Sequence, residues 1–116
     1  MALRKFVEKL TKPVDELDRE QLTDWSEARG GVALDAAPLR TNTRVAGEIS
    51  SVRIVPRAGA DALEVTVSDG RAYATAVFLG RRKIHGLTPG RRVILDGVLT
   101  GDDGRNVIYN PVYTLV

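Results

Sequence analysis

Residues 60–80 read ADALEVTVSDGRAYATAVFLG, which is two alternating apolar segments joined by an Asp-Gly turn. Side chains of a strand point to opposite faces in turn, so each segment predicts a strand with one face in a core. Asp69-Gly70 is a strong hairpin signal. In the second segment we expect the alanines and Phe78 to face inward, because a small, tightly curved sheet has room there for small side chains. The predicted core residues of the two strands are Leu63, Val65, Val67, Ala74, Ala76 and Phe78.

Working outward from this hairpin, three further alternating segments complete a five-stranded sheet. One helical turn is inserted between the third and fourth strands, over residues 80–90. This order, with its glycine-containing turns, predicts a mainly β protein, a five-stranded Greek-key barrel of the OB type. The expected strands are residues 44–54, 63–68, 73–79, 91–100 and 106–116.

Single residues predict three details of these strands. Ser50-Ser51 marks a bulge in the first strand, because the apolar alternation changes parity there. Gly97 marks a sharp bend in the fourth strand, and Pro111 implies an edge position or a bulge in the fifth. The inward-facing residues expected in the fourth strand are Val93, Leu95 and Val98.

A helical extension precedes the barrel, and we place the boundary between residues 1–42 and residues 43–116. An amphipathic helix is expected over residues 2–10, because four apolar side chains repeat at helical spacing. A second helix is expected from about Val14 to Ala28, with Trp25 as its core anchor, and a linker follows it. The apolar face of the first helix could pack on the barrel or form a homodimer contact, and it consists of Leu3, Phe6, Val7 and Leu10.

The composition limits the classes of function. The chain has 116 residues and no Cys, so neither a disulfide nor a thiolate metal site is possible. No apolar run approaches the roughly 20 residues of a membrane span, and the N-terminus lacks a signal-peptide core, so we expect a cytoplasmic location. The one His, His85, lacks partners for a zinc site or a catalytic triad. We therefore expect no metal, no cofactor and no enzyme activity.

Charge is distributed unevenly along the chain. Residues 1–39 hold six Lys/Arg and eight Asp/Glu, which gives −2, whereas residues 40–116 hold eleven and seven, which gives +4. Ten of the eleven cations in the second part are Arg. Because Arg donates bidentately to phosphate and stacks on bases, the barrel is the part expected to attract nucleic acid.

Several phrases in the barrel resemble a known family. Ser68-Asp69-Gly70, residues 77–84 (VFLGRRKI), residues 86–92 (GLTPGRR) and residues 109–113 (YNPVY) are similar to the small OB-fold nucleic-acid-binding proteins of actinobacteria. They are more distantly similar to the wedge-type OB domain of branched-DNA helicases. The resemblance covers roughly residues 43–116, and its most specific part is FLGRR followed by LTPGRR. It implies an OB barrel that binds nucleic acid, without the helicase motor or an activity of its own.

Eleven residues are candidate contacts to nucleic acid. Tyr73 and Thr75 on the third strand, next to Thr66 on the second, occupy the face that OB barrels commonly use for bases. Tyr73 offers a stacking platform there, or it packs beneath the N-terminal helices. The cations around the inserted turn, on the two flanking loops and, for Arg53, on the first strand could neutralise phosphates, or they form a solvated face. These cations are Arg53, Arg57, Arg81, Arg82, Lys83, Arg91, Arg92 and Arg105.

These observations predict a non-enzymatic module that binds single-stranded or partly unpaired DNA or RNA. Contacts would run mainly from Arg to phosphate across the face of strands two and three, because an aromatic content of 5% leaves little surface for base readout. The alternative is a protein-interaction or scaffolding module that oligomerises through its N-terminal helices. Docking to a membrane surface through the amphipathic start is a third, minor option.

Overall fold

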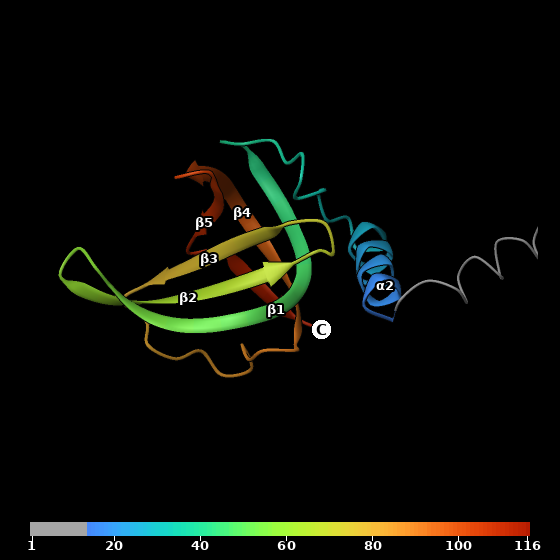
Figure 1. Cartoon of the computed structure of the whole chain (residues 1–116). Coiled ribbons are helices and arrows are strands. Elements are labelled where there is room, and N and C mark those ends of the chain that lie inside the picture. The colour runs from blue at the N-terminus through green and yellow to red at the C-terminus, as the bar shows by residue number, and fades with distance from the viewer. Residues whose placement is uncertain (1–13) are drawn as a thin grey trace, which may run out of the picture.

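The computed structural model describes residues 14–116 (Figure 1). The predicted helix over residues 2–10, with Leu3, Phe6, Val7 and Leu10, lies outside the described residues. No helix within 14–116 is long and apolar enough to cross a membrane. The elements are α2 (Val14–Ala28), β1 (Asn42–Arg57), β2 (Ala60–Ser68), β3 (Tyr73–Leu79), β4 (Arg92–Asp102), β5 (Arg105–Tyr109) and β6 (Val112–Leu115).

The first five strands form a closed ring. β1 pairs with β2 along its second half and with β4 along its first half, while β2 continues the sheet to β3. β3 runs parallel to β5, which pairs antiparallel with β4 and closes the ring. The predicted bulge in β1 is confirmed between Ile49 and Ser51, and it bends this long strand so that it can serve both halves (Figure 1). The chain is therefore mainly β, with the predicted OB-type barrel behind one N-terminal helix.

The inner face of the ring holds the predicted core. All six core residues expected from β2 and β3 are buried in one cluster. Leu34, from the segment between α2 and β1, joins the same cluster, and its amide donates to Asp69 Oδ2 at 2.9 Å. The linker therefore closes one end of the barrel as part of its core. The confirmed core residues are Leu63, Val65, Val67, Ala74, Ala76 and Phe78.

The expected fifth strand is in fact two strands. The strand is interrupted at Asn110-Pro111, where Asn110 has a φ of 46°. The second piece, β6, pairs with β4 alone. Pro111 has no amide hydrogen to donate, which agrees with its position at a break rather than inside a ladder. The helical turn expected between β3 and β4 was also wrong, because residues 80–91 contain turns and bends without helix.

The inward set of β4 differs from the prediction at one position. Val93 and Leu95 are buried, but Val98 is 46% exposed, and Leu99 lies in the core in its place. The expected bend at Gly97 would have shifted the parity of the strand. Alternation instead continues through Gly97 without a break, so Leu99 keeps the same side as Leu95.

α2 has the predicted bounds and is attached beside the turn between β2 and β3 (Figure 1). Leu22 is its buried apolar residue, and Thr23 Oγ1 donates to the carbonyl of Asp69 at 2.8 Å. Gly70 is required at this contact, because a Cβ there would lie 2.3 Å from the carbonyl oxygen of Arg19 and the backbone has a φ of +88°.

Trp25 is not the core anchor that the sequence suggested. Its ring is half-buried and lies outside the apolar core. The guanidinium groups of Arg29 and Arg92 lie 5.7 and 5.0 Å from its centroid, so cation–π contacts hold it instead.

Candidate nucleic-acid interface

The outer face of β1, β2, β3 and β5 presents its side chains in rows across the strands. Arg53 pairs in register with Glu64, Glu64 with Val77, and Val77 with Tyr109, so one row crosses all four strands. The next row joins Thr66, Thr75 and Val107 in the same way. We call this surface the outer face, and it contains the predicted positions on strands two and three.

One end of the outer face is a network of paired charges. Glu64 is only 5% exposed, and it accepts hydrogen bonds from Arg53 and Arg57, each at 3.3 Å. Arg57 also donates to the hydroxyl of Tyr109 at 3.1 Å, and its guanidinium lies 5.6 Å from the centroid of that ring. These contacts, first the bond to Tyr109 and then the carboxylate of Glu64, raise the pKa of Arg57 above its ordinary value. Two cations against one anion leave this end with a net positive charge.

The floor between the two ends of the face consists of small and apolar side chains. Val77, Val107 and Ala62 are fully buried here and form a second apolar cluster outside the barrel core. Thr75 lies on the predicted face, next to Thr66 at 3.5 Å between hydroxyl oxygens, but it is only 6% exposed. It therefore belongs to the floor rather than to the accessible rim.

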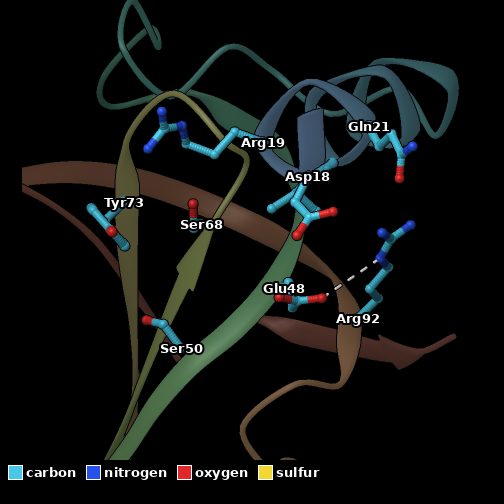
Figure 2. Close-up of a pocket in the computed structure, with 9 residues that line it drawn as sticks. Asp18, Arg19, Gln21, Glu48, Ser50, Ser68, Tyr73 and Arg92 are labelled. Atoms are coloured by element: carbon cyan, nitrogen blue, oxygen red, sulfur yellow. Dashed lines mark ion pairs between the residues drawn. The ribbon is translucent and has the colours of Figure 1, made fainter. Parts of the chain in front are cut away.

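Tyr73 occupies the opposite end and is 62% exposed. It borders a hollow whose lining includes Thr66, Thr75 and Arg105, so these predicted residues do come together. A second hollow begins at the same ring and continues beneath α2 (Figure 2). The helix therefore flanks Tyr73 without covering it.

The predicted cations of the inserted loop are divided between two places. Arg82, Lys83 and Arg91 line a groove beside loop residues 80–91, away from the rows of the outer face. Arg82 pairs with Asp61 at 2.6 Å, which places this loop next to the start of β2. Arg81 is exposed on the same loop. Arg92 faces α2 and Trp25 instead, so Arg91 and Arg92 do not act as one cluster.

Two residues of this face were not identified from the sequence. Tyr109 supplies a second exposed ring, at 38%, and Glu64 holds the two arginines beside it. Glu64 stands between the predicted core residues Leu63 and Val65, so alternation places it on the outer side, and this is the available signal for that residue. For Tyr109 the signal is ambiguous, because the main core takes Ile108 and the outer cluster takes Val107, so apolar residues occupy both sides of β5.

Comparison with known proteins bears on the fold. No protein-family model matches the chain, and no curated protein is similar to it in sequence. Among solved structures, the chain is similar to the solution structure of a replication factor A related protein from Methanobacterium thermoautotrophicum. The match has a TM-score of 0.54 and 17% identity, and it covers 74% of this chain and 90% of the other. The barrel therefore has the OB fold of that protein.

Proposed function

We propose that the chain binds single-stranded or partly unpaired nucleic acid on the outer face, as a binding module without catalytic activity. The observation that carries the proposal is the pair of exposed tyrosines, Tyr73 and Tyr109, at the two ends of one surface. Their positions differ by four residues along β3, or roughly 13 Å at about 3.3 Å per residue, so they can stack on different bases.

Charge on the same surface supports this proposal. At one end, the two positive charges of Arg53 and Arg57 outnumber the single negative charge of Glu64. Arg105 lies at the other end of the face. Guanidinium groups beside exposed rings suit a ligand that alternates phosphates and bases. The fold similarity to a replication factor A related protein is consistent with a nucleic-acid partner. The narrower resemblance to actinobacterial OB-fold proteins remains a prediction, as does oligomerisation through the N-terminal helices.

Fluorescence anisotropy with labelled thymidine and uridine oligonucleotides at low salt tests the proposal. We expect saturable binding that weakens as salt rises. Replacing Tyr73 and Tyr109 together by Ala should weaken it about a hundredfold, on stacking contributions of ~1–3 kcal/mol per base. His85→Ala with Val112→Ala is the control, because both residues are exposed and lie off the outer face. Undetectable binding by the folded protein at low salt would refute the proposal.

A further inference from the structure

A pocket of about 340 Å³ separates α2 from the barrel next to Tyr73. Strands β1, β2 and β3, with Arg92 at the start of β4, provide one side of it, and the first turns of α2 provide the other (Figure 2). We call it the α2 pocket. It is continuous with the outer face, because Tyr73 lines both this pocket and the hollow that contains Thr66 and Arg105. The lining residues used below are Asp18, Arg19, Glu48, Ser50, Tyr73 and Arg92.

The polar groups on one side of the α2 pocket are hydrogen-bond acceptors. The carboxylates of Asp18 and Glu48 both line the pocket, and Figure 2 shows them on the side away from Tyr73. Asp18 makes no ion pair or hydrogen bond within the described part of the chain, and Glu48 has only a long contact of 3.9 Å to Arg92. Ser50 already donates its hydroxyl to the carbonyl of Thr66 at 3.2 Å, so it too presents an acceptor.

The two carboxylates disfavour a phosphate on their side of the pocket, although Arg19 and Arg92 also line it. α2 has six acidic residues and one Arg between Val14 and Ala28, so it repels an anion brought beneath it. A strand bound on the outer face would keep its backbone away from the helix and turn a base toward it. Tyr73 at the mouth offers a ring for that base to stack on.

We propose that the α2 pocket receives a nucleobase that carries an exocyclic amine, and that it discriminates against thymine and uracil. Carboxylates accept hydrogen bonds from the exocyclic amine of cytosine, and adenine and guanine also carry such an amine. Thymine and uracil present a carbonyl oxygen where cytosine presents the amine, and this oxygen would face Asp18 and Glu48. The proposal rests on the proposed function, because it assumes that nucleic acid lies on the outer face.

Two oligonucleotides that differ in whether the base carries the exocyclic amine provide the test. The probes are a thymidine dodecamer and a 5-methylcytidine deoxydodecamer, which share the C5 methyl group and differ at position 4 of the ring and in the N3 proton. Anisotropy is measured at low salt and mildly alkaline pH, where cytosine is unprotonated. We expect the 5-methylcytosine oligomer to bind about tenfold more tightly, the discrimination expected of one carboxylate–amine contact.

Variants then locate the discrimination in the pocket. Asp18→Asn with Glu48→Gln should bring the ratio of the two affinities close to one, because amides can also donate to a carbonyl. Glu16→Gln with Asp24→Asn also removes two negative charges, both from α2 outside the pocket, and should leave the ratio unchanged. Thermal melting of each variant shows whether the fold is retained.

The outcomes separate the two proposals. Two results would overturn the pocket proposal while leaving the proposed function in place. One is equal binding of the two oligomers by the wild type, and the other is an unchanged ratio of the two affinities in the folded Asp18/Glu48 variant. Loss of the preference in the Glu16/Asp24 control would overturn the pocket proposal as well, because helix charge alone would then explain the preference. Binding of neither oligomer would overturn both proposals.

Discussion

The two tyrosines of the outer face lie in opposite settings. Tyr109 is held by Arg57, which is held in turn by the buried carboxylate of Glu64. Tyr73 is the more exposed ring, and its side chain makes no hydrogen bond or ring contact with any other residue of the described chain. The Tyr109 end is therefore preorganised before a ligand binds. At the Tyr73 end, the ring and the neighbouring carboxylates remain free to contact a ligand.

This difference has a consequence for binding. A preorganised ring and guanidinium lose little conformational entropy when a base stacks on them. The Tyr73 end must order a side chain, but it borders the α2 pocket and so has more polar groups with which to distinguish bases. We therefore expect both rings to contribute affinity and the Tyr73 end to contribute selectivity in addition.

The largest expected effect comes from removing the support of the Tyr73 end. Asp69 is buried, and its carboxylate accepts from the amides of Leu34, Arg71 and Ala72 at 2.9, 2.9 and 3.0 Å. Asp69→Ala leaves these donors without a partner, so we expect a loss of about 3 kcal/mol in the free energy of unfolding. Urea denaturation measures it. Asp69→Asn, which retains one carbonyl acceptor, should lose less, and a loss in Asp69→Ala no greater than in Asp24→Asn would contradict the assignment.

Single tyrosine replacements sharpen the comparison with a smaller effect. Tyr73→Ala and Tyr109→Ala should each weaken oligonucleotide binding about tenfold, on stacking of ~1–3 kcal/mol per base. The corresponding Phe variants should differ from each other. Tyr109→Phe removes the acceptor for Arg57 and should weaken binding slightly, whereas Tyr73→Phe keeps the ring and should bind like the wild type. Equal effects of the two Phe variants in anisotropy titrations would argue that the ends are equivalent.

The smallest expected effect is on the salt dependence of binding. Arg105→Gln removes a cation at the Tyr73 end and should reduce the slope of log affinity against log salt by about 0.7, the value for one phosphate on a single strand. Arg53→Gln should reduce it less, because Arg53 pairs with the buried Glu64 at 3.3 Å, whereas Arg105 has only a long contact of 3.9 Å to Asp102. Titrations at several salt concentrations give both slopes, and a larger change for Arg53 would reverse this ranking.

Alternation along single strands predicted much of the barrel. It placed Leu63, Val65 and Val67 inside and Glu64 and Thr66 outside, because successive side chains of one strand must take opposite faces. The prediction for Val98 was wrong, because Gly97 was expected to shift the alternation of the fourth strand and the alternation continues through it. The prediction for the last strand was also wrong, because the break at Pro111 depends on which neighbours remain available for pairing.

The candidate site was harder to predict than the core. Tyr73 and Thr66 were identified because they lie on adjacent strands of one hairpin, where register follows from a short turn. Arg57 and Tyr109 are far apart in sequence and meet only through the parallel pairing of β3 with β5. Contacts between distant segments also decide where Arg91 and Arg92 lie. They are adjacent in the chain but point to different surfaces, so the sequence could not show that they do not form one cluster.

The sequence by itself determined the hairpins, the faces of the strands and the concentration of arginine in the barrel, because these depend on neighbours along the chain. The tertiary structure alone decided which cations are paired, which rings are exposed, and that α2 borders a pocket at Tyr73. Those properties arise from contacts between distant segments. Their geometry depends on how the ring closes and where the helix is attached, and local periodicity carries no information on either.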